Sequence, residues 1–65
     1  MANVFAAGGE LGPVRWERVG PAYSVWLNGV MAKPNATRAE VEVAVALARR
    51  GDTVAAIRRA LYGGA

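Results

Sequence analysis

The sequence predicts an α+β fold: a three-stranded antiparallel sheet followed by a two-helix hairpin, with an extended arm at the N-terminus. Two observations support this prediction. Apolar and polar residues alternate through residues 14–33, where turn-forming dipeptides interrupt the pattern. Residues 37–63 instead repeat apolar residues at helical spacing, and Gly51 divides them into two segments.

The chain is short and lacks the residues that usually reinforce small domains. It has 65 residues and contains neither cysteine nor histidine. A domain of this size buries only about 60% of its unfolded surface, so its core alone gives a small margin of stability. Disulfides and zinc sites cannot add to that margin, and we expect no cofactor. Association with itself or with other protein subunits is the expected source of additional stability.

Charge and hydropathy limit the possible partners. Eight Lys and Arg residues against five Asp and Glu residues give a net charge of +3, which suits nucleic acid or an acidic protein surface. The apolar runs are far shorter than the roughly 18 residues of a membrane span, and the first residues lack the apolar core of a signal peptide. We therefore expect a cytoplasmic protein, or a virion component if it belongs to a viral assembly, with no membrane partner.

The N-terminal segment is rich in residues that disfavour regular structure: Gly8, Gly9, Gly12 and Pro13. We interpret residues 1–13 as a flexible or docking arm and residues 14–65 as one small α+β domain. Val4 and Phe5 are the bulky apolar pair of the arm, and we expect them to bind a neighbouring chain. A frayed terminus is the alternative.

Residues 14–33 are predicted to form the three strands. Gly20, Pro21 and Ala22 separate the first strand from the second, which resumes at Tyr23. Asn28 and Gly29 then form a strong hairpin signal, because a type I′ turn requires positive φ at both central positions.

This turn also predicts which side chains share a face of the sheet, since cross-strand partners point the same way. The predicted inner face, against the helices, comprises Tyr23, Val25, Leu27, Val30 and Ala32. The predicted outer face comprises Ser24, Trp26, Met31 and Lys33. Trp16 is assigned to the core. Trp26 and Met31 would form an exposed patch, typical of a protein contact surface, with Lys33 as its basic neighbour.

The helices are predicted from their ends. Thr37 and Glu40 have the spacing of a capping box, which begins the first helix, and Gly51 supplies a left-handed residue to end it. Asp52 or Thr53 then caps a second helix, which ends before Gly63.

Each predicted helix has an apolar face. In the second helix the apolar face comprises Val54, Ile57, Ala60 and Leu61. The first helix has one stripe of Val41, Ala44, Val45 and Ala48 and a second of Val43 and Leu47. We infer that the first helix packs on the sheet with one stripe and on the second helix, or a second subunit, with the other.

The sequence offers little for catalysis. Glu40 and Glu42 lie about 200° apart around their helix and cannot share a proton or a metal. The glycines near the N-terminus do not form a phosphate-binding loop. No nucleophile, base and orienting group can be named together, so we expect no enzyme, no metal and no small-molecule substrate.

Two arginine pairs are candidate nucleic-acid contacts. Arg49 and Arg50 end the first helix, and Arg58 and Arg59 lie in the second. With Lys33 they could bind phosphates. The alternative is that they only complement the helix dipoles.

Residues 49–61 resemble the first two helices of the helix-turn-helix class. In that class a glycine lies between the helices, as Gly51 does, and a Ser or Thr two residues later caps the next, as Thr53 would. The resemblance implies DNA binding through a third helix, which would follow Gly63. The order of strand and two helices is also similar to ribbon-helix-helix dimers, whose β-ribbon reads bases.

Two functions remain open from the sequence. The first is a small non-enzymatic structural or interaction protein, for example a subunit of a virus particle, that uses the arm and the Trp26 patch. The alternative is a small basic DNA-binding protein, regulatory or architectural, that uses arginine–phosphate contacts.

Overall fold

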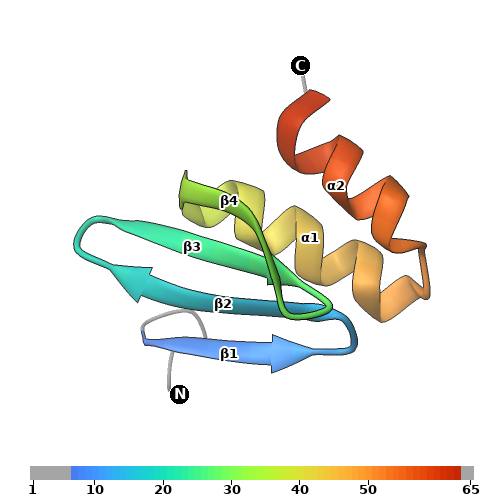
Figure 1. The fold of residues 1–65 in the computed structure, drawn as a ribbon, viewed down its shortest axis with the longest axis horizontal. Helices are drawn as coiled ribbons and strands as arrows, with labels where there is room; N and C mark the ends of the chain where they lie inside the picture. Colours follow the sequence, from blue (N-terminus) through green and yellow to red (C-terminus); the bar gives the residue numbers. More distant parts are fainter. Residues whose placement is uncertain (1–6, 64–65) are drawn as a thin grey trace.

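The computed structural model describes residues 7–63, which form a four-stranded antiparallel sheet followed by two helices (Figure 1). The strands are β1 (Gly8–Leu11), β2 (Val14–Val19), β3 (Ala22–Leu27) and β4 (Val30–Ala36), and the helices are α1 (Arg38–Arg50) and α2 (Val54–Gly63). The strands lie in the sheet in their chain order. Helix α1 lies against β1, β2 and β3, while α2 lies against α1 and β4.

The α+β class and the order of strands before helices are confirmed, but the prediction of three strands is wrong. Residues 8–11, which the sequence pattern assigns to the arm, pair with β2 as β1. The glycines that disfavour a strand in isolation allow close packing here. A Cβ on Gly9 would lie 2.5 Å from Cζ2 of the Trp16 indole, so β1 can lie over the ring only with glycine at this position. Val4 and Phe5 lie outside the described residues.

Each hairpin closes through a two-residue loop that begins with a positive φ. Gly12 and Gly20, each followed by proline, have φ of 57° and 62°. In the third loop Asn28 and Gly29 have φ of 53° and 80°, the requirement of a type I′ turn. The Asn28–Gly29 turn is therefore confirmed.

Strand β4 contains two register shifts that the turn does not predict. Trp26 pairs with Met31, but Val25 pairs with Lys33 instead of Ala32. A β-bulge of this kind places two residues opposite one and re-aims the side chains that follow. Lys33 therefore contacts the helices, and its predicted place on the outer face of the sheet is wrong.

The boundaries of α1 follow the predicted caps. The Thr37 hydroxyl accepts the N–H of Glu40, and the Glu40 carboxylate accepts the N–H of Thr37. Gly51 has a φ of 88°. Its N–H donates to the carbonyl of Ala48, and the N–H of Asp52 donates to the carbonyl of Leu47. This pair of bonds is a Schellman motif, which satisfies the carbonyls at the end of the helix.

Of the two caps proposed for α2, Thr53 takes the role, since its hydroxyl accepts the N–H of Ala56.

The core lies between the sheet and both helices and comprises Val14, Trp16, Tyr23, Val25, Leu27, Ala32, Ala36, Val41, Ala44, Val45, Ile57 and Leu61. Val30, predicted to be inward, is 61% exposed next to the turn. The second stripe of α1 is half covered: Leu47 packs on the core, whereas Val43 is 48% exposed.

Candidate interaction surfaces

A row of side chains crosses the outer face of the sheet, which we define as the face opposite the helices. The register pairs Glu10 with Arg15, Arg15 with Trp26, and Trp26 with Met31. Trp16, which follows Arg15 in β2, is buried. Because successive side chains of a strand point to opposite faces, Arg15 points away from the helices, and its cross-strand partners point with it. We call these four side chains the outer row.

The middle of the outer row is a stacked pair. The Arg15 guanidinium carbon lies 4.6 Å from the centroid of the Trp26 ring, a cation–π contact that contributes about 0.5–1 kcal/mol at an exposed site. Trp26 is half-buried and Met31 is 47% exposed. The sequence correctly places Trp26 and Met31 together, but the basic neighbour predicted for them was Lys33, and this neighbour is instead Arg15.

Lys33 is held between the sheet and the helices. Its ammonium group donates to the Glu40 carboxylate and, over 2.9 Å, to the carbonyl of Leu61 near the end of α2. The same group lies 5.5 Å from the centroid of the Tyr62 ring, and the Tyr62 hydroxyl donates to the Ala32 carbonyl. The hydrogen bond from Lys33, followed by the backbone bond from Thr37, lowers the pKa of Glu40. These contacts give Lys33 a structural role.

Arg50 is also engaged within the chain. Its Nη2 lies 2.7 Å from Oδ2 of Asp52 and its Nε lies 3.3 Å from Oδ1, a two-pronged contact. The hydrogen bond from Arg50 lowers the pKa of Asp52, and the same bond raises the pKa of Arg50. Both side chains lie in the segment that ends α1.

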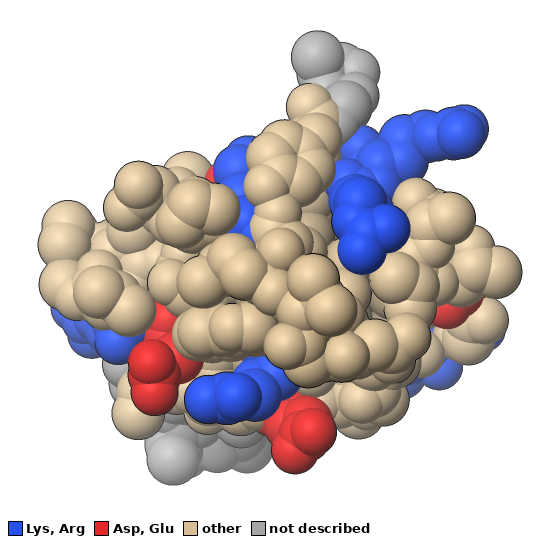
Figure 2. Space-filling view, viewed as in Figure 1, with Lys and Arg blue, Asp and Glu red and all other residues tan. Residues whose placement is uncertain are grey.

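The remaining arginines are exposed but lie in different places. Arg58 and Arg59 lie on α2, and Lys and Arg side chains gather over this helix in Figure 2. Arg49 instead borders the space between α1 and β1. For these three side chains the structure records no ion pair within residues 7–63. The cations predicted to bind phosphates therefore come from different elements, and Lys33 and Arg50 already have partners within the chain.

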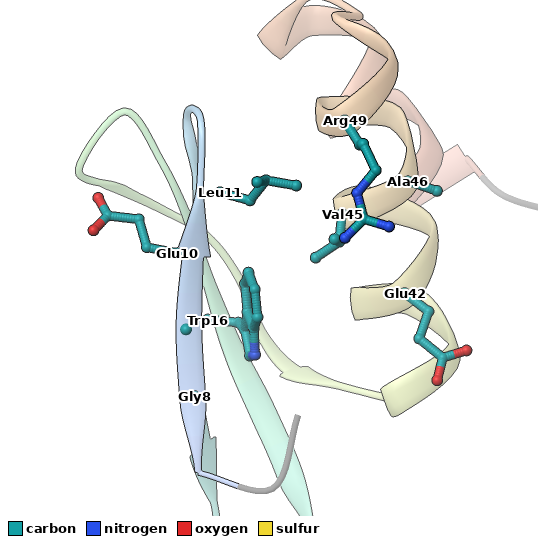
Figure 3. A pocket seen from close by; sticks show the side chains of 9 residues that line it. Gly8, Glu10, Leu11, Trp16, Glu42, Val45, Ala46 and Arg49 are labelled. Carbon is teal, nitrogen blue, oxygen red and sulfur yellow. The ribbon is translucent and has the colours of Figure 1, made fainter. Parts of the chain in front are cut away.

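A groove of about 670 Å³ separates β1 from α1 (Figure 3). Leu11 and Trp16 line it from the sheet and Val45 from the helix. Along α1, Arg49 lies toward the Leu11 end of β1, and Glu42 lies toward its Gly8 end. Sequence reasoning missed this groove because it did not place a strand at residues 8–11. The close approach of Gly9 to Trp16 depends on the tertiary structure and leaves no local signal.

Within residues 7–63, no group of three or more His, Cys, Asp or Glu side chains is arranged to hold a metal ion. The helices in the same range are too short or too polar to cross a membrane.

Comparison with known proteins gives no further guide, because no family model, curated protein or solved structure matches the chain. The resemblance to the helix-turn-helix class stays a prediction.

Proposed function

We propose that this chain is a small non-enzymatic interaction protein that serves as a subunit of a larger assembly, of which a virus particle is one example. The observation that carries the proposal is the outer row, in which Arg15, Trp26 and Met31 lie side by side on the sheet face opposite the helices. Aromatic residues, methionine and arginine are the residue types enriched where proteins meet. Stacking on Trp26 also restricts Arg15 before a partner arrives, which lowers the entropic cost of binding.

The size of the protein supports the same proposal. Its accessible surface is 4146 Å², and a standard interface buries about 800 Å² on each partner, roughly a fifth of that surface. One partner would therefore cover a whole face of the molecule. For a chain with so small a core, such coverage is a substantial addition to stability.

The test is the native mass of the protein and of variants in the outer row, measured by sedimentation. We expect the wild-type protein to exceed its monomer mass of 6.8 kDa at low micromolar concentration. Trp26→Ser with Met31→Ser should give smaller particles, because the apolar part of the row is removed. Val19→Ser is the matched control, since Val19 is also exposed on the sheet but lies outside the row. A wild-type monomer at every concentration would reject the proposal.

A second candidate function is DNA binding through α2, favoured by the exposed pair Arg58 and Arg59. Exposed arginines would contact phosphates with little sequence preference. Replacing both by glutamine should weaken binding to duplex DNA and reduce the slope of log affinity against log salt by about 0.9 for each phosphate that is no longer bound. Arg18→Gln on β2 is the control. If the wild-type protein binds no DNA at physiological salt, this candidate is excluded.

A further inference from the structure

The strand β1 has an edge that is suited to pairing with another strand. Within residues 7–63 it pairs only with β2. The N–H of Arg18 donates to the carbonyl of Ala7, so Ala7 directs its backbone groups toward β2, and by alternation Gly9 does the same. The backbone groups of Gly8 and Glu10 therefore point to the opposite edge. The strand contains neither lysine nor proline, the residues that commonly protect such edges.

The α1 side of the groove carries a self-complementary pair of charges. Glu42 and Arg49 are seven residues apart, so they lie almost on one line along the helix, about 10.5 Å from each other. The midpoint between them falls between Val45 and Ala46. A two-fold axis perpendicular to the sheet, passing beside β1 at the level of that midpoint, brings Glu42 of each copy opposite Arg49 of the other.

We propose that a second copy of this chain pairs with the β1 edge in antiparallel orientation about such an axis. The backbone groups of β1 that point away from β2, those of Glu10 among them, pair with the second copy, and the two sheets become one continuous sheet. Across the joined grooves, Glu42 of each copy forms an ion pair with Arg49 of the other. This inference rests on the proposed function as an interaction protein and names the partner of one of its surfaces.

The expected spacing of the two helices agrees with these residue types. Helix α1 lies against β1, β2 and β3, so it is centred near β2. Three strand spacings, about 14 Å, then separate the two α1 axes. A helix with its side chains is about 10–12 Å across, so short side chains such as Ala46 do not meet over this gap, whereas Glu42 and Arg49 have the length to do so.

The contacts that Glu42 and Arg49 make within their own chain leave both side chains able to form this ion pair with the second copy. Glu42 accepts a hydrogen bond from Arg38 over 2.9 Å, and both side chains are about half exposed. The Arg38–Glu42 ion pair is therefore a surface contact of small energy, and the Glu42 carboxylate can accept a second arginine beside Arg38. For Arg49 the structure records no ion pair within residues 7–63.

The decisive experiment exchanges the charges and then mixes the variants. Glu42→Arg and Arg49→Glu should each halve the native mass of the β1-paired dimer, because like charges then face each other at both ends of the groove. An equimolar mixture of the two variants should restore the dimer. In that mixture each introduced charge faces the opposite introduced charge, and the native Arg49 of one copy faces the native Glu42 of the other. A purely structural role within one chain does not predict this rescue.

Controls separate folding from pairing. Circular dichroism should show both variants folded, and Arg38→Gln should keep the dimer although it removes the neighbour of Glu42. Single variants that remain dimeric, or a mixture that remains monomeric, would overturn the inference.

A second pair of variants tests the strand edge itself. Glu10→Pro removes an N–H that faces away from β2, so it should abolish the dimer and leave the β1–β2 ladder in place. Glu10→Gln removes the charge but keeps the N–H, and should remain dimeric. If Glu10→Pro is folded and still dimeric, the edge does not pair.

These results are distinguishable from a failure of the proposed function. Substituting Trp26 and Met31 should reduce larger assemblies to the β1-paired dimer. If these substitutions instead give monomers while the charge variants stay assembled, the outer row holds the assembly and the inference about β1 is wrong.

Discussion

Lys33 shows how much one side chain can contribute in a chain of this size. It joins β4 to both helices through the Glu40 carboxylate and the Leu61 carbonyl. Carbonyls at the end of a helix lack partners within the helix, and a cation there is favourable for the helix dipole as well. With its side chain only 20% exposed, Lys33 is a structural cation rather than a binding one.

The first prediction concerns acid stability. Folding lowers the pKa of Glu40 below its ordinary value of 4.5, chiefly through the bond from Lys33. The folded state therefore gains stability from the ionised group above pH 4.5, and it loses this stability as the pH falls through the lowered pKa. Glu40→Gln, which can still accept from Thr37, should flatten the dependence of the unfolding free energy on pH in this acid range.

Urea unfolding at a series of pH values measures this effect, with Glu17→Gln as the control at an exposed carboxylate. Some acid sensitivity should remain in Glu40→Gln, because the pKa of Asp52 is also lowered. An unchanged pH profile would show that the Lys33 contact does not favour the ionised carboxylate.

The second prediction concerns Gly9. Its added Cβ would lie 2.5 Å from Cζ2 of Trp16, and this indole is buried, so the ring cannot move aside freely. Gly9→Val should destabilise the protein by about 1–3 kcal/mol, the usual cost of overpacking. Thermal unfolding measures it, with Glu10→Val as the control on the exposed side of the same strand. Equal midpoints for the two variants would contradict the packing of β1 on Trp16.

At the scale of elements, the sequence predicts best those features that depend on neighbouring residues. The capping box at Thr37, the left-handed Gly51 and the Asn28–Gly29 turn each depend on contacts within a few residues, and each is confirmed. The same turn placed Trp26 beside Met31, so part of the outer row was predictable. Arg15 was missed because its contact with Trp26 depends on the register between β2 and β3.

Features that depend on distant residues were not predictable in this way. Strand β1 exists because Gly8 and Gly9 can approach Trp16 closely, which no composition rule for glycine indicates. The bulges in β4 were also missed. They bring Lys33 to Glu40 and Leu61, and the advantage of these contacts appears only once both helices are in place. The groove and its charges followed from β1 and were missed with it.

The third prediction tests the second hairpin as an element. Asn28 has a φ of 53°, which a β-branched residue adopts only with strain. Asn28→Val should therefore destabilise the fold by about 1–3 kcal/mol although the side chain is exposed. Asn28→Gly is the matched control, since glycine accepts this φ without strain. Thermal midpoints that do not separate the two variants would mean that the turn does not hold the register of β3 and β4.

At the scale of the whole molecule, the two proposed surfaces are separate: one is the β1 edge of the sheet, and the other is the outer row on the sheet face opposite the helices. The β1 edge gives a closed two-fold contact, which by itself ends at a dimer. The outer row lies on the face opposite the helices, so it remains available after β1 pairs. Two independent contacts are what a repeating assembly needs, and the combination is consistent with the function proposed for the chain.

The last prediction concerns Val4 and Phe5, which the sequence predicts to bind a neighbouring chain. Because β1 begins at Gly8, a truncation that tests this idea must leave residues 7–11 intact. Deleting residues 1–6 should preserve the circular dichroism spectrum and the β1-paired dimer, while lowering the native mass of larger assemblies. Burying one phenylalanine contributes about 1.5–3 kcal/mol per contact, enough to decide assembly when several copies take part. Phe5→Ser in the full chain should have the same effect, with Asn3→Ser as its control. If both the truncated chain and Phe5→Ser keep the native mass of the wild-type protein, Phe5 does not take part in assembly.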